Sequence, residues 1–498
     1  MSLASFHQSL QKILGPDRIS LTPTNRLLYS HDAMSGLKLE SKAGHPRPLP
    51  DMIVWPETVH EISQIVKLAN REKVPMVPYG AGSGVSGGTV PVRGGVILDL
   101  KRMNRLEKIT SKNGLFYVTA ETGILGEHLE QTLQSQGFTL GHFPSSILCA
   151  TLGGYLACRS AGQLSSKYGK IEDMTDDIEV VLPNGDLLPF GRTVKNFPKV
   201  RPRDLFVGSE GCLGIITKAR LKVFPLPIQT RYRGVSFPRL ELALQAIRET
   251  MQTGLRPSVV RLYDPFDSLI LKQGYRGSKI PIPRRFISKK LYPLLFLNPS
   301  WTERIIKLVS SEVLLILGFE GSPEIASAQE KKMLEICRRS QGRDLGEGPG
   351  LHWLKHRYSV SFKMPQIFEE NGFVDTIEVA TTWDRLLKLY EGVKKVLTQD
   401  TLLLAHFSHA YPEGCSIYFT VIGRCRSPEE DTRRYAKLWH DAMETCLKMG
   451  ATISHHHGIG LLKAKYLPRE LGPAMDFFRE IKKKLDPQNI MNPGKMGL

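Results

Sequence analysis

The sequence predicts an α+β protein of more than one unit, and three observations lead to this prediction. The chain has 498 residues, more than one hydrophobic core usually holds, and 41% of them are hydrophobic. Glycine-rich loops alternate with β-rich runs in its first half. Helical and strand patterns alternate in its second half, which is typical of an α+β domain.

The first 227 residues read as a leader followed by a loop-rich domain. Residues 1–50 contain an amphipathic stretch at 6–14 and end in a proline-rich link. We expect a domain over 51–227, with a helix at 58–72 and a strand at 178–182.

The rest of the chain is expected to form a second domain over 228–450 and a C-terminal segment over 451–498. The segments with a clear period are predicted helices at 240–251, 323–340 and 383–397, and predicted strands at 313–317 and 416–422.

Residues 78–89 form a glycine-rich segment with the spacing of a dinucleotide-binding loop. Gly82-x-Gly84-x-x-Gly87 matches the literal fingerprint, but a Rossmann unit needs a helix directly after its glycines. Residues 90–100 are broken by proline and then β-rich, so the Rossmann fold is rejected. A glycine loop between strands still lets backbone N–H groups approach a pyrophosphate, because glycine adopts positive φ.

Two further segments have the same character. Residues 151–173 are rich in glycine, small residues and hydroxyls, and residues 208–217 contain three glycines. Each alone would be an ordinary cluster of turns. Three such segments in order need another explanation.

Residues 454–460 read Ser-His-His-His-Gly-Ile-Gly, and neither a helix nor a strand requires such a run. Imidazoles exchange protons near neutral pH, so three of them on one loop offer proton-transfer or anion-binding groups to a single ligand. A solvated or metal-binding tract is the alternative for a histidine run taken alone.

Together these segments resemble the FAD-binding proteins of the vanillyl-alcohol-oxidase superfamily, and within it the alkyl-dihydroxyacetonephosphate synthase family. The likeness covers nearly the whole chain and rests on residues 51–56, 78–89, 141–146, 151–154, 168–173, 208–211, 261–262, 383–385, 415–419 and the histidine triplet. It implies an α+β fold in which a two-part FAD-binding domain over 51–227 carries an α+β cap, the substrate domain, over 228–450. Residues 451–498 would return to the FAD-binding domain.

The resemblance also implies an activity. Such synthases exchange the acyl chain of acyl-dihydroxyacetone phosphate for a fatty alcohol through a flavin N5 adduct, a step of ether lipid synthesis without net redox change. FAD is expected to be noncovalent, because residues 78–89 contain neither histidine nor cysteine. His142 and Cys149 are candidates for covalent attachment by proximity alone.

The resemblance assigns catalytic roles to Tyr418, His456 and His457. Tyr418 would act as acid and base, with neighbouring positive charge lowering its pKa; a buried core tyrosine is the alternative. The implied FAD contacts are Pro78, Gly80, Ala81, Gly82, Ser83, Gly84, Val85, Ser86, Pro144, Ser146, Thr151, Gly153, Gly154, Ser160, Gly162, Tyr168, Gly169, Glu210, Gly211, Gly214 and Ile216. The candidate substrate-binding residues are Arg261, His455, Lys363 and His409. For Arg261, a surface ion pair with Asp264 is the structural alternative.

One departure from the synthases concerns the substrate phosphate. The family places an arginine shortly before a Glu-x-x-x-x-Trp element, and Phe368 stands at that position here. Lys363, Arg357 or His356 would substitute, but a lysine binds phosphate as a point charge without the arginine fork. The substrate's identity therefore stays open.

A second hypothesis comes from the glycolate and D-lactate dehydrogenases of the same superfamily. Residues 457–460 and 408–410 of this chain are similar to motifs of those enzymes. In that interpretation His409 binds a metal, and His457 takes the hydroxyl proton while flavin accepts hydride. His456 stands where the acidic ligand should be, and Tyr418 lies near the place of a second histidine, so no metal site is expected. A third hypothesis is a basic membrane-binding scaffold with a vestigial flavin fold.

The net charge and the cysteines limit the classes of partner and the cellular compartment that we expect. The net charge of +18 calls for an anionic partner, yet no nucleic-acid-binding signature is present. Residues 272–297 combine basic and apolar side chains, which suits either a membrane surface or a mobile lid. Seven cysteines without a C-x-x-C pair favour a reducing compartment. We expect a cytoplasmic protein, peripheral on a membrane in one alternative, with a lipid substrate; a homodimer is compatible with the resemblance.

Overall fold

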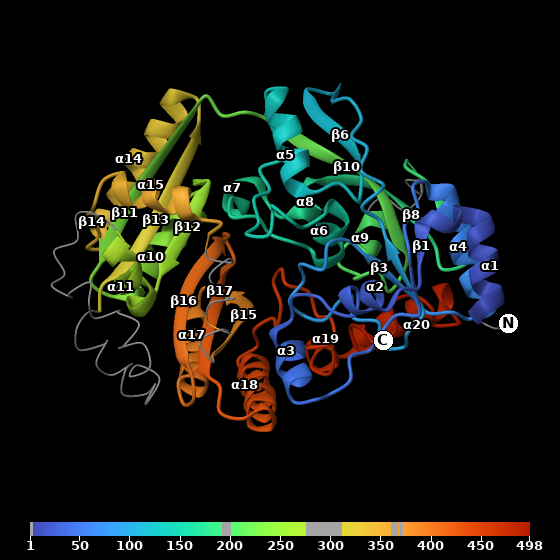
Figure 1. Ribbon diagram of the computed structural model, residues 1–498. Coiled ribbons are helices and arrows are strands. Elements are labelled where there is room, and N and C mark those ends of the chain that lie inside the picture. The colour runs from blue at the N-terminus through green and yellow to red at the C-terminus, as the bar shows by residue number, and fades with distance from the viewer. Residues whose placement is uncertain (1–2, 192–200, 275–310, 360–366, 368–371) are drawn as a thin grey trace. The chain divides into compact units, whose positions relative to one another are not determined.

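The computed structural model describes residues 3–191, 201–274, 311–359, 367 and 372–498 (Figure 1). The chain divides into two compact units. Unit 1 comprises residues 1–162, 169–226 and 456–498, and unit 2 comprises residues 163–168 and 227–455. The functional assignment of the predicted domains stays a prediction.

The first sheet of unit 1 has the order β1-β2-β4-β3. Its strands are β1 (Ile19–Ser20), β2 (Met52–Val54), β3 (Met76–Tyr79) and β4 (Val96–Asp99). β2 and β3 run parallel to β4, and β1 runs antiparallel to β2. The segment after the glycine loop thus continues into strand β4, as the rejection of a Rossmann unit predicted.

Helices α1 (Leu3–Leu14) and α4 (Val59–Glu72) pack together in unit 1 (Figure 1). The predicted helix at 58–72 begins at Thr58, where a capping box with Glu61 satisfies free N–H groups of the first turn. Leu10 of α1 and Ile62 of α4 are fully buried in one core cluster with strand β4. The predicted leader is therefore part of the core of unit 1.

The second sheet of unit 1 is antiparallel, with the order β5-β6-β10-β8-β9, and β7 also pairs with β10. Its strands are β5 (Thr110–Lys112), β6 (Leu115–Glu121), β7 (Phe138–Thr139), β8 (Thr175–Val181), β9 (Leu187–Leu188) and β10 (Ile215–Pro225). The other helices of unit 1 are α2 (Pro23–Leu28), α3 (Ser35–Lys42), α5 (Gly126–Ser135), α6 (Leu152–Cys158), α8 (Ile171–Met174), α9 (Pro202–Phe206), α19 (Leu467–Leu471) and α20 (Pro473–Leu485), with the 3-10 turn η1 (Pro16–Arg18).

Unit 2 contains one seven-stranded antiparallel sheet of order β14-β11-β13-β12-β16-β17-β15. Its strands are β11 (Gln229–Phe237), β12 (Val259–Tyr263), β13 (Val313–Gly321), β14 (Arg343–Asp344), β15 (Gly372–Thr382), β16 (Leu402–Ala410) and β17 (Gly414–Arg424). Its helices are α7 (Ser165–Tyr168), α10 (Leu240–Gln252), α11 (Pro265–Gly274), α14 (Pro323–Arg339), α15 (Gly348–His356), α17 (Leu386–Leu397) and α18 (Pro428–Lys448).

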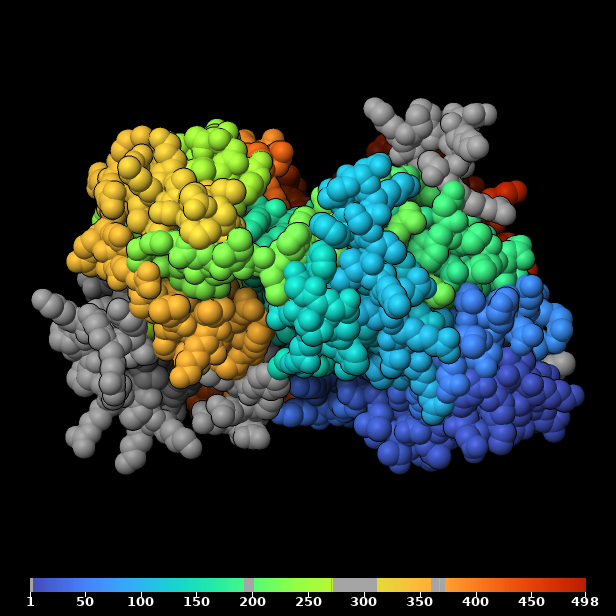
Figure 2. Space-filling view, turned by 90° about the horizontal axis from the view of Figure 1, so that it is seen from above, coloured from blue at the N-terminus to red at the C-terminus, as the bar shows by residue number. Residues whose placement is uncertain are grey.

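Helices α17 and α18 cover one face of this sheet at strands β15, β16 and β17 (Figure 1). On that face, Asp375 accepts hydrogen bonds from Tyr435 and Trp439 of α18. α10 and α14 pack together and form part of the surface of unit 2, light green and yellow in Figure 2. Because successive strand residues alternate between faces, Tyr418 and Glu378 point away from α17 and α18.

The predicted elements of unit 2 agree with the structure except at one helix start. The helix expected at 383–397 begins at Leu386, because Trp383 belongs to the preceding turn. The Trp383 indole donates to the carbonyl oxygens of Tyr411 at 3.0 Å and Pro412 at 3.1 Å. No helix in the described part of the chain is long and apolar enough to cross a membrane.

Candidate functional site

The glycine loop of unit 1 follows strand β3 and has little room for side chains. Gly82 and Gly87 have φ values of +62° and +77°, a region that suits glycine. A Cβ atom on Gly80 would lie 2.3 Å from the hydroxyl oxygen of Thr151. The loop and the second glycine segment therefore touch at a point that only glycine allows.

Thr151 fixes the start of the second segment. Its hydroxyl oxygen accepts a hydrogen bond of 3.2 Å from the Gly154 N–H and caps helix α6. At Gly153, a Cβ atom would lie 3.1 Å from the Thr122 carbonyl oxygen. The spacing Thr-x-Gly-Gly thus combines a cap with close backbone packing.

Glu210 joins the third glycine segment to the loop after the histidine triplet. Its carboxylate is buried and accepts hydrogen bonds from the backbone N–H groups of Ile459 and of Gly460, the latter at 2.8 Å. Burial raises the pKa of Glu210, and the two N–H donors and nearby Lys463 and Lys495 act in the opposite direction. A Cβ atom on Gly458 would lie 2.8 Å from the same carboxylate.

The glycine loop also holds the histidine loop directly. The Ser86 hydroxyl donates to the carbonyl oxygen of His457 at 3.2 Å, and the Ser86 carbonyl accepts from Leu461 N–H at 2.8 Å. The rings of His456 and His457 meet edge to face, 4.7 Å apart. His455 belongs to unit 2, so unit 1 brings together two of the three predicted histidines and three glycine segments.

The residues predicted between 142 and 162 line a neighbouring part of unit 1. The buried His142 ring lies 3.2 Å from the Ser160 hydroxyl, and burial, with His456 nearby, lowers its pKa to about 3. A Cβ atom on Gly162 would lie 2.5 Å from the backbone nitrogen of residue 143. Pro144 and Ser146 form the turn before α6, and the Ser146 carbonyl accepts from the backbone N–H of residue 150.

Other predicted FAD contacts lie elsewhere. Gly214 packs on strand β8, where a Cβ atom would lie 2.9 Å from Val180 Cγ1, and Ile216 is a buried residue of β10. Tyr168 belongs to unit 2 and donates a 2.8 Å hydrogen bond to Glu320, whereas Gly169 belongs to unit 1 with φ +85°.

Asp32 is a residue of unit 1 that sequence reasoning missed. Its carboxylate is buried, accepts from the Met34 N–H at 3.0 Å and from the N–H groups of Gly87 and Gly88, and lies 3.5 Å from the Cβ position of Gly84. Burial raises its pKa to about 6. A lone aspartate in the leader carries no motif, so only the fold could reveal it.

Unit 2 brings four chemically active side chains into one row. Strand register places Tyr263 beside His406, His406 beside Tyr418, and Tyr418 beside Glu378. The His406 and Tyr418 rings are stacked 4.7 Å apart. Glu378 is fully buried, His406 is 8% exposed and Tyr418 is partly exposed, so the row combines two phenols, an imidazole and a carboxylate.

The pKa of Tyr418 moves against the sequence-based expectation. Burial of the phenol raises it, and the hydrogen bond with Thr376 and the charge of Arg261 lower it by less. The expected lowering by positive charge is therefore present but smaller than the effect of burial.

Arg261 points into this row. Its Nη2 lies 2.9 Å from His406 Nε2, and its guanidinium lies 5.4 Å from the centre of the Tyr263 ring. Asp264 is fully buried and accepts from the Tyr390 hydroxyl at 2.9 Å. The alternative of a surface pair between Arg261 and Asp264 is wrong, because the carboxylate is in the core.

A second cluster of unit 2 surrounds His409. Its Nδ1 lies 2.7 Å from the Ser165 hydroxyl, and its ring stacks on His455 at 5.4 Å. The His455 backbone N–H donates to Glu378, which links this cluster to the row with Tyr418.

Two candidates for the missing phosphate clamp are in α15 and the turn after it. Arg357 lies over the Tyr358 ring at 4.7 Å, and His356 packs on His352 at 4.6 Å. Lys363, Phe368 and most of the basic segment 272–297 lie outside the described residues.

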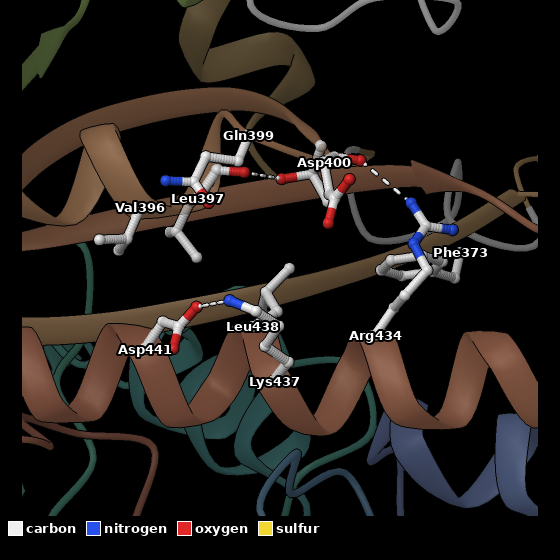
Figure 3. Close-up of a pocket in the computed structure, with 10 residues that line it drawn as sticks. Phe373, Val396, Leu397, Gln399, Asp400, Arg434, Lys437, Leu438 and Asp441 are labelled. Atoms are coloured by element: carbon white, nitrogen blue, oxygen red, sulfur yellow. Dashed lines mark hydrogen bonds and ion pairs between the residues drawn. The ribbon is translucent and has the colours of Figure 1, made fainter.

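The pockets among the described residues include two within unit 2. One, of about 410 Å³, adjoins His455 and the end of β15; it is lined by Ala380, Thr381, Thr382, Arg385, Tyr411, Glu413, Gly414, Cys415, Gly450, Thr452 and His455. The other lies by α17 and α18, where Arg434 donates to the Asp400 carbonyl and Lys437 pairs with Asp441 (Figure 3). Those polar groups already pair with each other.

Residues 226–496 match the family model of FAD linked oxidases, C-terminal domain. The chain belongs to the FAD-linked oxidase family. Residues 50–191 match the FAD binding domain model. The two models thus match successive parts of the chain.

Two relatives and one solved structure refine the family. Alkyldihydroxyacetonephosphate synthase of Trypanosoma brucei brucei is 30% identical, over 99% of this chain and 80% of the relative. The mitochondrial D-lactate dehydrogenase [cytochrome] of Arabidopsis thaliana is 30% identical, over 90% of this chain and 73% of the relative. A solved alkyldihydroxyacetonephosphate synthase superposes with a TM-score of 0.79 at 26% identity, over 99% of this chain and 86% of that one.

These matches confirm the predicted resemblance and fold. This member of the FAD-linked oxidase family has a two-domain α+β fold like that of the solved synthase, and its family is FAD-dependent. The residues of unit 1 fit a flavin nucleotide, because Gly82 and Gly84 carry no side chain and a glycine backbone can bring its N–H groups close to a pyrophosphate.

Proposed function

We propose that this protein exchanges the acyl chain of acyl-dihydroxyacetone phosphate for a fatty alcohol. The observation that carries the proposal is Tyr418, which matches the synthases' tyrosine and lies between the buried His406 and Glu378 in the sheet register. The full-length likeness to a synthase is consistent with it.

Unit 1 would hold FAD without a covalent bond. The glycine loop 80–86 would lie against the pyrophosphate, and residues 151–154 and Glu210 with Gly211 would support it. His142 does not favour attachment, because its ring is buried and its Nε2 already lies 3.2 Å from the Ser160 hydroxyl. When bound, the flavin would supply an electrophilic N5 atom to the exchange.

Unit 2 would handle the protons and the anionic end of the substrate. The exchange breaks the carbon–oxygen bond to the leaving carboxylate and forms one to the alcohol oxygen, with no electron acceptor. A proton taken from the substrate carbon must return to it, and the proton that the alcohol loses must pass to the departing carboxylate or to solvent. In unit 2, Tyr418 is proposed to exchange these protons, and Arg261 and His455 to bind the substrate. The resemblance also assigns an assisting role to His456 and His457, which belong to unit 1.

A raised phenol pKa suits this role. Tyr418 stays protonated at neutral pH in the resting protein, so it would first give its proton to the departing carboxylate and would then accept one as the phenolate. Its row includes the fully buried Glu378, which offers a carboxylate oxygen nearby.

The lipid nature of both substrates leads to a proposal about location. We infer a peripheral protein that reaches its substrates at a membrane surface, as the net charge of +18 favours contact with anionic lipid. Flotation with vesicles of anionic lipid tests this, and equal recovery with neutral vesicles would argue against it.

Anaerobic stopped-flow spectroscopy tests the reaction itself. The purified flavoprotein is mixed with acyl-dihydroxyacetone phosphate while the visible flavin absorption is followed. Bleaching that a fatty alcohol then reverses, without any electron acceptor, is expected for the exchange. Rapid bleaching by D-lactate, glycolate or D-2-hydroxyglutarate that only an acceptor reverses would replace this proposal.

The second candidate is a 2-hydroxy acid dehydrogenase. The plant D-lactate dehydrogenase is as similar in identity as the trypanosome synthase, and His409 matches a residue of that class. In unit 2, however, His409 Nδ1 already lies 2.7 Å from the Ser165 hydroxyl, and Tyr418 occupies the place expected for a second histidine.

A further inference from the structure

His406 is a residue that the sequence did not single out, although it lies at the centre of the row in unit 2. It contacts Arg261 at one ring nitrogen, stacks on Tyr418 with one ring face, and has Asp267 on its other side. Each contact constrains a different property of the imidazole.

The contact with Arg261 fixes the proton of the ring. A guanidinium group carries only donors and stays charged, so the 2.9 Å contact between Arg261 Nη2 and His406 Nε2 requires Nε2 to accept. An accepting Nε2 carries no proton, and the neutral ring then holds its proton on Nδ1. Nδ1 faces the Asp267 carboxylate, 3.9 Å away.

The same contact orients Arg261. One Nη atom points at His406, and Arg261 Nε, although buried, has no hydrogen-bond partner among the described residues. A buried donor of a charged group is costly when it stays unpaired, so this nitrogen favours an anionic ligand. The imidazole thus holds the guanidinium in an orientation in which the Arg261 Nε–H group can donate to a ligand.

The stacking contact constrains Tyr418. The two rings are 4.7 Å apart and inclined by 18°, so the imidazole covers one face of the phenol. A ring held by Arg261 therefore also limits the rotation of Tyr418.

We propose that His406 is a positioning residue, locked as the neutral Nδ1–H tautomer by Arg261, that aligns Arg261 for the anionic end of the substrate and Tyr418 for proton transfer. The kinetic part of this proposal rests on the proposed function; the tautomer does not.

Two variants separate the two effects. His406→Phe keeps a ring beside Tyr418 and removes the acceptor for Arg261. His406→Gln keeps an acceptor near the position of Nε2 and removes the ring. With acyl-dihydroxyacetone phosphate, the Phe variant should raise KM by about tenfold to a hundredfold, because it removes a hydrogen bond to a charged group. The Gln variant should restore KM to within about threefold and lower kcat instead.

Folding is checked by FAD content and thermal unfolding of each holoprotein. Similar losses of kcat and KM in both variants, with FAD retained, would mean general disturbance and overturn the proposal. Unchanged kinetics in both would overturn it as well.

A spectroscopic measurement makes the test independent of turnover. In holoprotein labelled with ¹⁵N-histidine, the signals missing from the His406→Gln spectrum identify His406, and their shifts report which nitrogen is protonated. A protonated Nε2 overturns the proposal. If His406 has the expected tautomer but the protein does not turn over acyl-dihydroxyacetone phosphate, the contact between His406 and Arg261 stands and the proposed function is wrong.

Discussion

The environment of Tyr418 differs from that of Tyr435, a hydrogen-bonded tyrosine of helix α18. Tyr435 donates to the buried Asp375 on the face covered by α18, as a core tyrosine does. Tyr418 is on the opposite face, partly exposed, stacked on His406 and next to Glu378. The two tyrosines therefore form a matched pair for separating catalysis from stability.

Removing the Tyr418 hydroxyl should affect rate and not folding. In Tyr418→Phe we expect kcat for the acyl exchange to fall by about 10² to 10⁴, the range for loss of a general acid or base, with FAD content unchanged. In the control, Tyr435→Phe, the unfolding free energy should fall by about 1–3 kcal/mol, since a buried carboxylate loses a donor, and kcat should stay close to that of the parent. Full activity in Tyr418→Phe would contradict the catalytic role and would mean that Tyr418 is a structural side chain.

Asp32 should make stability depend on pH. Its pKa in the folded protein is about 6 against an ordinary 3.8, because burial disfavours the charged form. The stabilisation from the neutral carboxyl is therefore complete below about pH 4 and is lost as pH rises through 6. A difference of about two pKa units corresponds to about 3 kcal/mol.

Asp32→Asn removes this titration. Between about pH 4 and pH 7, the stability of the variant relative to the parent should shift in its favour by up to about 3 kcal/mol. Urea unfolding followed by tryptophan fluorescence at a series of pH values measures the difference. A difference that does not change with pH would show that the Asp32 carboxyl does not titrate as described.

At the scale of elements, the glycine loop after β3 needs glycine for two reasons, close packing within the protein and room for a pyrophosphate. Single substitutions can separate the two. Gly80 is limited by the protein itself, because its Cβ would lie 2.3 Å from the Thr151 hydroxyl oxygen. Gly84 has more room, with the nearest atom of the protein 3.5 Å from its Cβ position. Neither has a positive φ, so backbone strain does not enter the comparison.

Gly80→Ala should lower the melting temperature of the apoprotein, because the threonine cap of α6 must shift. Gly84→Ala should leave the apoprotein unchanged and weaken FAD binding, because a methyl group would then stand between the loop backbone and a pyrophosphate. Differential scanning fluorimetry and FAD titration measure the two effects. Normal FAD affinity in Gly84→Ala would place the pyrophosphate away from this part of the loop.

At the scale of the whole molecule, each unit contains its own part of the candidate chemistry. Unit 1 joins segments around residues 32, 80–88, 151–154, 210 and 456–460, which are far apart along the chain. Unit 2 joins Arg261, His406, Tyr418 and Glu378 across four strands.

The way in which unit 1 holds FAD can be tested on the whole protein. We expect acid or heat precipitation to release the flavin quantitatively into the supernatant, because no histidine or cysteine occurs in residues 78–89. Absorbance of the supernatant and the intact mass of the pellet measure it. A mass increase of the protein equal to FAD would point to covalent attachment, and His142→Ala and Cys149→Ala would then identify the residue.

The sequence by itself determined the elements and the family. Periodicity located α4, α10 and α14, and the helix missing after residues 78–89 excluded a Rossmann unit, because these features depend on local chain geometry. The glycine and histidine motifs led to the FAD-linked oxidases. These signals are readable because close backbone approach and special φ values restrict residue types locally.

Only the tertiary structure decided the surroundings of the candidate residues. Asp32 and His406 carry no motif, yet one supports the glycine loop and the other stacks on Tyr418. The direction of the Tyr418 pKa and the burial of Asp264 were also beyond the sequence. Burial and contact depend on strand register and on segments hundreds of residues apart, so no local pattern encodes them.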